Sequence, residues 1–593
     1  MFRPVLDAVG GSLFLTALVA MLPLLTIFIL LGGLRLAAWK AGIAALLVSI
    51  VIAIWAYSMP VGMAVSSGIE GAAFGFFPIM WIVINAIWVY NMTVATGHFD
   101  VLRRSFASIS DDQRIQAVII AFSFGALLEA LAGFGTPVAI TSVMLIALGF
   151  RPLKAAVVAL VANTAPVAFG ALAVPITTLA TVSQQPEHTL SQIVGRQTPL
   201  LGVFVPMALV FIIDRGRGVR ATLPATLTCG ITFAVAQFVT SNYISTPLTD
   251  IVASLVSALA VVLLLRVWQP KQAYVESEVE QAEVVAAGAR GARTSATRAM
   301  EAEGSDRHAD QPAEPHTGRR RAVPMESDAG AEDLATMRAR DEAAHDRGSD
   351  VFKAYAPYLI IIVVFVLAQL PGIKDALDAP TKVFNWPGLD GLQSASGKAS
   401  KIPQFKLNWL AAAGTLMLIS GIVSIPVLGI SPARALRAYG TTLKQLAAAI
   451  VTVMAVLGLA YVMNASGQTS SLGTWMAGAG GAFALLSPIL GWLGVAVTGS
   501  DTSSNSLFGA LQVTAAKDAG LHPALMAAAN SSGGVLGKMI SPQNLAIAAA
   551  AVGMSGREGD IFRRVIGWSI AFVAFMCVLV FLQSTAVLSW MIP

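Results

Sequence analysis

Residues 124–137 read FGALLEALAGFGTP, and Glu129 is the one charged residue in this apolar stretch. A carboxylate is costly inside a bilayer, so acidic residues there usually face a cavity or the interior of a helix bundle, often as proton relays. Gly125 and Gly133 are predicted to share a helix face with Glu129, which lets another backbone approach closely. Glu129 is therefore a candidate for handling protons or substrate; a carboxyl group kept neutral or paired for packing is the alternative.

The composition places this stretch in a membrane protein. Of 593 residues, 56% are hydrophobic and 12% are charged, whereas about a quarter of the residues in a soluble domain are charged. Apolar runs recur along the chain at lengths that approach a bilayer crossing. We predict an all-α polytopic membrane protein with about 12–14 transmembrane segments, some of them half-crossings or re-entrant hairpins. The clearest runs are Leu13–Leu31, Gly42–Trp55, Ile79–Tyr90, Leu200–Ile213, Ile251–Leu265, Tyr358–Leu370, Leu410–Leu428 and Ile570–Leu588.

One long hydrophilic segment divides the chain. Residues 271–350 hold 17 of the 33 acidic residues and 11 of the 38 basic residues, with few aromatic residues, a composition typical of disorder. We predict an N-terminal transmembrane repeat with flanking helices at 1–268, a disordered cytoplasmic loop at 269–352, and a C-terminal transmembrane repeat at 353–593 with an extracytoplasmic loop at 372–406. Cys229 and Cys577 lie in apolar stretches and are predicted to be small core residues.

Basic clusters set the orientation, because short cytoplasmic loops are rich in Lys and Arg. One path satisfies all the clusters: both termini lie outside and residues 272–349 lie inside. The same path makes Ile115–Phe150, which contains Glu129, enter and leave from the cytoplasmic side. The clusters are Arg35/Lys40, Arg103/Arg104/Arg114, Arg151/Lys154, Arg215/Arg217/Arg220, Arg434/Arg437/Lys444 and Arg557/Arg563/Arg564.

A pattern occurs twice in the chain. Asn163 is followed after seven residues by Gly170 and after five more by Pro175, and Asn530, Gly537 and Pro542 repeat this spacing. In the membrane topology deduced from the basic clusters, the two copies cross the membrane in opposite directions, which is typical of inverted-repeat transporters.

Both copies are expected to interrupt their helices at mid-membrane, the first at Pro166 and the second at Gly533-Gly534. Backbone groups freed in this way must line protein or a water-filled cavity, where a helix N-terminus could hold a small carboxylate. The alternative is a helix kink in which Ser and Thr bond back to carbonyl groups. The predicted substrate-binding side chains are Asn163, Thr164, Asn530, Ser531 and Ser532.

The second hairpin contributes further polar residues. Residues 498–512 read TGSDTSSNSLFGALQ, which as a helix would align Asp501, Asn505 and Gln512. Asp501 is a second candidate for proton coupling, or a helix N-cap. Lys538 lies in an apolar stretch and needs an anion, which could be Asp501, Glu129 or a substrate carboxylate; snorkelling is the alternative. Asn505, Gln512 and the interfacial Glu70 are secondary candidates.

Three blocks together resemble the bacterial L-lactate permease family, which includes glycolate permeases. They are FGALLEALAGFGTPVAI, AVTGSDTSSNSLFGALQ and GGVLGKMISPQNLAIAAA, in this order. The resemblance covers most of the chain outside the two hydrophilic inserts and implies proton-coupled uptake of small 2-hydroxymonocarboxylates across the cytoplasmic membrane. The segment 272–349 departs from the compact family pattern.

Other functions are less favoured. Sodium-coupled carboxylate uptake or cation/proton exchange is the alternative, since carbonyl and hydroxyl oxygens at helix breaks can ligate sodium. An enzyme is not expected, because the sequence contains neither HExxH nor GxSxG. We expect no organic cofactor or metal and no nucleic-acid partner; the partners are the bilayer and a small carboxylate. The preferred hydroxy acid, the proton stoichiometry and the oligomeric state stay open.

Overall fold

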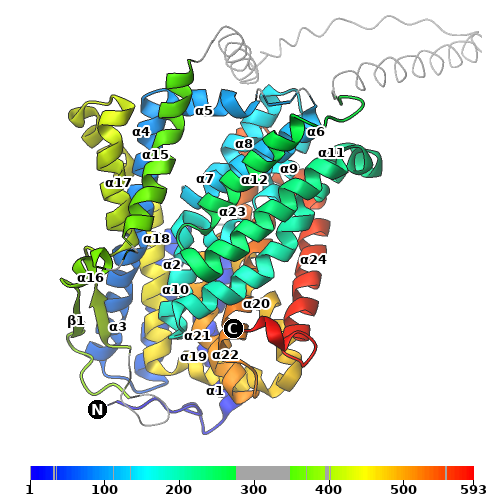
Figure 1. The fold of residues 1–593 in the computed structure, drawn as a ribbon. Coiled ribbons are helices and arrows are strands. Elements are labelled where there is room, and N and C mark those ends of the chain that lie inside the picture. Colours follow the sequence, from blue (N-terminus) through cyan, green and yellow to red (C-terminus); the bar gives the residue numbers. More distant parts are fainter. Residues whose placement is uncertain are drawn as a thin grey trace, which may run out of the picture.

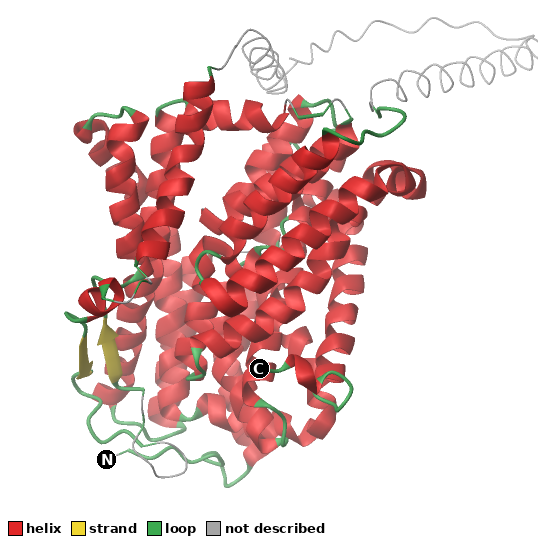
Figure 2. Cartoon of the chain, viewed as in Figure 1, coloured by secondary structure: helices red, strands yellow, loops and turns green. Residues whose placement is uncertain are grey.

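The computed structural model describes the chain except residues 1, 31–33, 35, 108, 111, 132, 134, 275–346, 369, 371, 394–399, 401 and 555–556. Most of the predicted cytoplasmic loop 269–352 therefore lies outside the described residues. The described chain is built mainly from helices (Figure 2), as predicted.

Eight described stretches are long and apolar enough to cross a membrane, or up to nine if the bent pair Pro152–Ala162 and Val167–Ser183 counts as one span. Four shorter apolar helices accompany them. The stretch Glu187–Ile244 folds back on itself, because Asp214 and Arg215 leave helical geometry and Gly230 then packs against Val203. One stretch can thus supply two passes. These features confirm a polytopic helical membrane protein with broken helices.

One group of helices forms a bundle, most of it on the left in Figure 1, with α5 (His98–Ala107) across the top and α1 (Leu13–Phe28) at the bottom beside α19 (Gln468–Met476). Glycines allow its close packing: a Cβ on Gly458 of the central helix would lie 2.9 Å from the carbonyl oxygen of Gly68. The bundle comprises α1 (Leu13–Phe28), α2 (Ala38–Trp55), α3 (Val61–Phe74), η2 (Gly75–Met80), α4 (Trp81–Ala95), α5 (His98–Ala107), α15 (Gly348–Leu367), α17 (Ala413–Leu428) and the central α18 (Pro432–Ser466).

The insert between α15 and α17 carries the one sheet of the described residues. It contains α16 (Ile373–Asp378) and the antiparallel strands β1 (Lys382–Asn385) and β2 (Gln404–Leu407), with Lys382 opposite Leu407. The rings of Trp386 and Phe405 stand 5.2 Å apart. Phe2 forms a parallel β-bridge with Leu392, so the insert lies beside the N-terminus of the chain, at the lower left of Figure 1. The described chain is therefore helical, as predicted, with one small two-stranded sheet in this insert.

The remaining helices repeat one order of elements: a hairpin, a broken helix and a long helix. The first copy enters from the upper end of Figure 1 and the second from the lower end, so the repeat is inverted. The first copy comprises α6 (Gln113–Ala117), η3 (Val118–Phe124), α7 (Gly125–Leu131), α8 (Thr136–Ala147), α9 (Pro152–Ala162), η4 (Val167–Phe169), α10 (Gly170–Ser183), α11 (Glu187–Val239), η5 (Thr240–Ile244) and α12 (Thr249–Leu265).

The second copy follows α18 in the chain. It comprises α19 (Gln468–Met476), η6 (Ala477–Ala482), α20 (Phe483–Thr498), α21 (Asp501–Asp518), α22 (Pro523–Gly537), η7 (Lys538–Ile540), α23 (Pro542–Ala551), α24 (Glu558–Gln583) and η8 (Ser589–Met591).

Two local predictions are wrong. Helix α22 continues through Gly533-Gly534 and is broken after Gly537. These two glycines provide space instead: a Cβ on Gly533 would strike the backbone of Pro488, and one on Gly534 would strike Asp501. Helix α7 ends at Leu131 and Gly133 has a φ of +50°, so Gly133 belongs to the hairpin turn rather than to the helix face of Glu129. Both cysteines are buried and free, as predicted.

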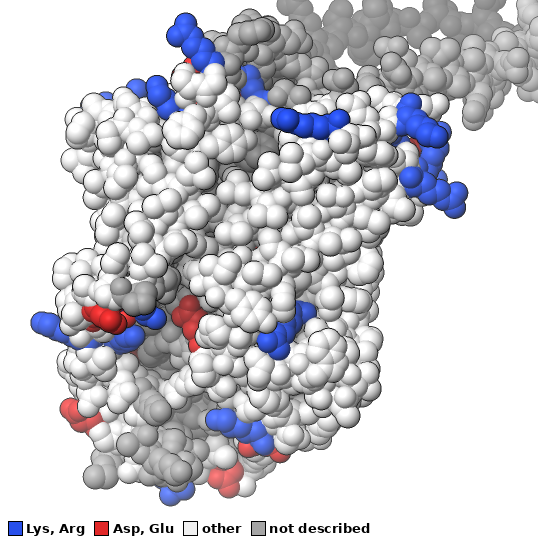
Figure 3. Space-filling model, viewed as in Figure 1, with Lys and Arg blue, Asp and Glu red and all other residues white. Residues whose placement is uncertain are grey.

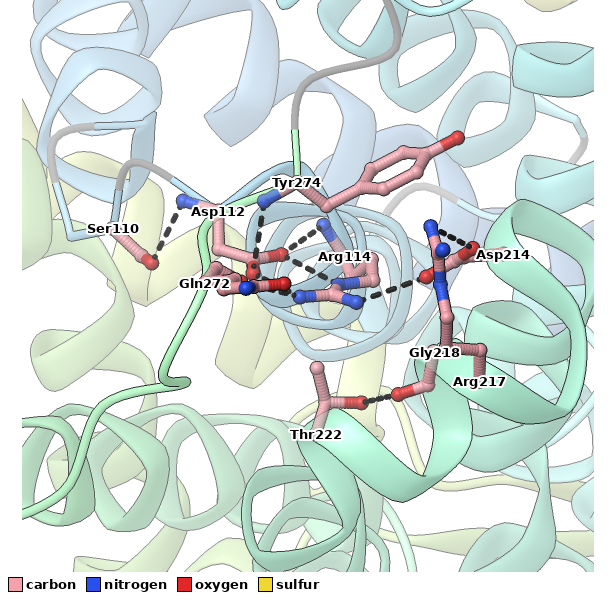
Figure 4. A network of polar contacts seen from close by, with 9 residues as sticks. All are labelled: Ser110, Asp112, Arg114, Asp214, Arg217, Gly218, Thr222, Gln272 and Tyr274. Carbon is pink, nitrogen blue, oxygen red and sulfur yellow. Dashed lines mark hydrogen bonds and ion pairs between the residues drawn. The ribbon is translucent and has the colours of Figure 1, made fainter. Parts of the chain in front are cut away.

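A polar network ties together the base of the first hairpin, the fold in α11 and the chain that leaves α12 (Figure 4). The guanidinium of Arg114 donates to Asp112 at 2.7 Å, to Asp214 at 2.9 Å and to the carbonyl of Gln272 at 2.9 Å. Its charge also lies 5.3 Å from the centre of the Tyr274 ring. Arg114 thus fixes where the hairpin enters the protein.

Candidate functional site

The tips of the two hairpins meet at the start of α23. In the first tip, a Cβ on Gly135 would lie 3.2 Å from Oδ1 of Asn544. In the second tip, the carbonyl of Gly499 accepts a hydrogen bond from Nδ2 of Asn544 at 3.3 Å. Both glycines have positive φ, +83° and +75°, which glycine adopts without the steric cost of a Cβ. A single side chain, Asn544, therefore lies against both hairpins.

Glu129 lies beside the first tip and pairs with Lys538. Their side chains form an ion pair at 2.5 Å between Oε1 and Nζ. The other carboxyl oxygen accepts a hydrogen bond from Nδ2 of Asn163 at 2.9 Å. Of the two protein carboxylates proposed for Lys538 from sequence, Glu129 is thus the one in contact. The first hairpin, the first broken helix and the second broken helix each supply one of these residues.

The first break brings strained backbone to the ion pair. Ala171, Leu172 and Ala173 have φ values of 46°, 59° and 61°, a left-handed turn that costs about 1–2 kcal/mol for each non-glycine residue. Such strain persists where surrounding contacts hold it, often at functional sites. Just before this turn, a Cβ on Gly170 would lie 2.7 Å from Oε1 of Glu129, so a glycine is needed beside the carboxylate.

Asp501 lies in the second hairpin, directly after its turn, at the start of α21. Ser500 is the N-cap of α21, accepting from the backbone of Ser503, so the suggestion that Asp501 is the N-cap is wrong. The Asp501 carboxyl instead faces inward, and its Oδ2 accepts from Ser531 at 2.6 Å and from Asn505 at 3.3 Å. Asp501 also lies within electrostatic range of Lys538 and Glu129.

Amide side chains connect the second hairpin to the first broken helix. Asn505 donates to the carbonyl of Pro175 at 3.1 Å, and its oxygen accepts from Asn530 at 2.9 Å. Asn530 in turn accepts from Gln512 at 3.1 Å. The predicted polar stripe of α21 is thus one continuous network, which links the two copies of the repeat.

Three predicted residues lie outside this network. Thr164 donates to the carbonyl of Val161 at 2.7 Å, the local bond expected of a kink. Ser532 points to the other side of α22 and donates to Gln197 at 2.6 Å. Glu70 is buried in α3 of the neighbouring bundle, at 1% exposure. Among the described side chains, no hydrogen bond or ion pair joins any of the three to Glu129, Asp501 or Lys538.

Sequence reasoning missed Asp250. It is fully buried, accepts from Gln237 at 2.8 Å and interacts electrostatically with Glu129. Gln237 also reaches the carbonyl of Ala165 in the first break, at 3.5 Å. The signal was present, because Asp250 directly precedes an apolar run, but an acid at that place is also typical of a first helical turn.

The centre is closed and incompletely hydrogen-bonded. Glu129, Asn163, Asp501 and Lys538 are each 6% exposed or less. Within the described part of the chain, Asn163 Oδ1, Asp501 Oδ1 and Asp250 Oδ2 are buried without a hydrogen-bond partner. Buried polar atoms are normally paired, so these oxygens are the places where a proton, water or a small polar ligand can add a bond. An ammonium group and two carboxyl groups at one closed centre can exchange protons and anions.

The sequence of the chain is similar to those of known proteins. The sequence model of the family described as L-lactate permease matches residues 16–302 and 323–587; the unmatched residues 303–322 lie inside the hydrophilic segment 272–349. The L-lactate permease of Bacillus subtilis (strain 168) is 39% identical, over 99% of this chain and 98% of its own. The glycolate permease GlcA of Escherichia coli (strain K12) is 41% identical, over 97% and 96%.

A third relative, the L-lactate permease of Escherichia coli (strain K12), is 38% identical over 98% of both chains. Among solved structures, the Alcanivorax borkumensis YdaH transporter aligns with 87% of this chain and 86% of its own, at a TM-score of 0.38 and 15% identity. The family match spans nearly the whole chain and includes all three blocks that carry the resemblance. The chain therefore belongs to the L-lactate permease family.

Proposed function

We propose that this protein is a proton-coupled symporter that imports L-lactate and related 2-hydroxymonocarboxylates such as glycolate across the bacterial cytoplasmic membrane. The observation that carries the proposal is the buried ion pair between Lys538 and Glu129 at 2.5 Å. The names of the relatives, L-lactate permease and glycolate permease, support the substrate class.

The ion pair supplies a reason for coupling. A buried charge that loses its partner is strongly destabilising. Protonation of Glu129 would leave the ammonium group of Lys538 unpaired, and a substrate carboxylate would restore its partner. Conversely, a carboxylate that enters without a proton would add a negative charge to a centre that already holds Glu129 and Asp501. Charge balance therefore favours one proton for each monocarboxylate.

The surrounding amides and the hydroxyl group of Ser531 complete the site. Asn163 and Asn530 are carried by the two broken helices. Asn163 donates to Glu129, and Asn530 donates to Asn505, which itself bonds to Asp501. When Glu129 is neutral, Asn163 can turn its amide to the carboxylate or the 2-hydroxyl of the substrate. Asp501, held by Ser531 at 2.6 Å, is the second proton-accepting group. Movement of the hairpin tips away from α23 would then open the centre.

Uptake of labelled L-lactate into proteoliposomes tests the proposal. An inward proton gradient should drive accumulation at zero membrane potential, and lactate entry should bring protons with it. A sodium gradient at equal pH on both sides should drive none. Accumulation with the sodium gradient alone would instead establish the sodium-coupled alternative, for which the unpaired oxygens of Asn163 and Asp501 are the candidate ligands. Glycolate, pyruvate and dicarboxylates as competitors would define the substrate.

The same proposal includes an orientation. Both termini lie at one end of the molecule, and the ends of α12 and α15 that flank 275–346 lie at the other (Figure 1). The basic clusters favour a cytoplasmic location for the second end. Accessibility of single cysteines at the exposed positions 5 and 349 to an impermeant reagent in intact cells would test this: residue 5 should react and residue 349 should not.

A further inference from the structure

A pocket of about 330 Å³ lies between α9, the folded end of α11 and α24, away from the central ion pair. All four charged residues that line it are basic: Arg151, Lys154, Arg215 and Arg564. They come from three helices that are distant in sequence, so the fold itself gathers them. Figure 3 shows Lys and Arg side chains around this end of the molecule, where α11 turns back.

The acidic residues nearest in sequence are engaged by other cations. Asp214, which precedes Arg215, is bound by Arg114 at 2.9 Å and faces away from the pocket toward the network of Figure 4. Asp560, one turn before Arg564, is bound by Arg557 at 2.9 Å and lies 3.8 Å from Arg563. These two acids therefore do not balance the positive charges of Arg215 and Arg564, which creates a demand for an anion at this side of the pocket.

The pocket also has an apolar wall that faces outward. Phe211 is 48% exposed, and its ring packs edge-on against Trp568 with centroids 6.0 Å apart. Both aromatic residues lie in stretches long and apolar enough to span the bilayer. Aromatic rings that adjoin basic groups at the end of a membrane span are the surroundings of a lipid headgroup and its upper acyl chain. A soluble anion would use the basic groups but not this wall.

We propose that this pocket binds the phosphate group of an anionic phospholipid, with the acyl chain along Phe211 and Trp568. Lys154 already donates to the carbonyl of Ile213 at 3.1 Å, which holds its ammonium group at the fold in α11. Arg215 lines the pocket from α11 and Arg564 from α24. The bound lipid would join α9, α11 and α24 at the predicted cytoplasmic surface. This inference does not depend on the identity of the transported substrate.

Native mass spectrometry of the full-length protein in detergent tests the proposal, with phosphatidylglycerol as the probe. Phosphatidylglycerol should bind with a saturable high-affinity site, and phosphatidylcholine should not. Each basic residue near an anionic headgroup contributes a factor of about five, so Arg215→Gln and Arg564→Gln should each weaken binding about fivefold. Arg563→Gln is the matched control, because Arg563 adjoins Arg564 but is 80% exposed and does not line the pocket; its binding should match the wild type.

Three outcomes would overturn the proposal: equal binding of the two lipids, unchanged binding in the Arg215→Gln/Arg564→Gln variant, or full displacement of the lipid by millimolar inorganic phosphate. The last result would identify a site for a soluble anion. Arg564→Lys keeps the charge and should keep the binding, which separates loss of the site from loss of the fold.

Discussion

Glu129 and Lys538 are separated by 409 residues in the chain and by 2.5 Å in the structure. The contact joins the first hairpin to the second broken helix, so it can form only when the two copies of the repeat are packed together. It is also the contact that a substrate carboxylate would have to replace.

Glu129→Gln should uncouple transport from protons. The amide can still contact Asn163 but cannot take up a proton, so accumulation of L-lactate driven by a pH gradient should be lost. Exchange of internal for external lactate should persist, because it requires no net proton movement. Asp375→Asn removes an exposed carboxyl group and serves as the control; it should behave like the wild type. Gradient-driven uptake by the Gln variant would reject the role of Glu129.

Lys538→Gln should destabilise the protein as well as abolish transport. It leaves the Glu129 carboxylate buried without its cation, a change that typically costs about 3–5 kcal/mol, so the midpoint of thermal unfolding in detergent should fall. In Lys538→Gln/Glu129→Gln the midpoint should recover while lactate uptake stays absent. Additive losses of stability in the double variant would mean that the pair is not coupled as described.

Gly170→Ala should impair transport indirectly, by disturbing the neighbouring Glu129 carboxylate. The added methyl group would lie 2.7 Å from Oε1 of Glu129 and displace that carboxylate from Lys538. We expect a loss of uptake of tenfold or more, which corresponds to about 1.4 kcal/mol. Gly440→Ala in α18 is the control, since nothing lies within 4 Å of the added Cβ. Equal uptake by both variants would show that the carboxylate tolerates the displacement.

Ser531 and Ser532 are adjacent in the chain but bond to different partners, so substitutions of the two can be compared directly. Ser531 donates to Asp501 and Ser532 to Gln197, both at 2.6 Å. Ser531→Ala removes a hydrogen bond to the Asp501 carboxylate, so the pH at which uptake is half-maximal should shift. Ser532→Ala should leave that pH unchanged. An identical pH profile for all three proteins would remove Asp501 from the coupling mechanism.

Arg114→Gln should lower stability strongly. Arg114 is buried between Asp112 and Asp214, and its removal leaves both carboxylates without their main cation, a loss of about 3–5 kcal/mol. Arg217 lies 3.6 Å from the same Asp214 but is 80% exposed, so Arg217→Gln should cost about 0–1 kcal/mol. Thermal unfolding of the two variants in detergent measures the difference.

Much of the site could be predicted one residue at a time. Glu129, Asp501 and Lys538 stand out because a charge in an apolar segment is visible without knowledge of the fold. Their partners depend on tertiary packing, and the sequence left three anions open for Lys538. Asn163 and Asn530 were found through the repeated spacing, a relation between two segments rather than a property of either.

The errors have a common physical origin. Gly533-Gly534 could signal either a weak helix or a close approach, and only the position of α20 decides between them. Asp250 was missed because its place before an apolar run is equally typical of a helix start. The left-handed turn at Ala171, Leu172 and Ala173 uses residues that favour right-handed helices, so only the surrounding structure can reveal it.

The position of α23 has a consequence for leakage. Since Asn544 contacts the turns of both hairpins, a displacement of one turn leaves the other still seated against the same short helix. In the proposed transport cycle, movement of one hairpin at a time would leave one barrier in place, which would limit the passage of protons without substrate.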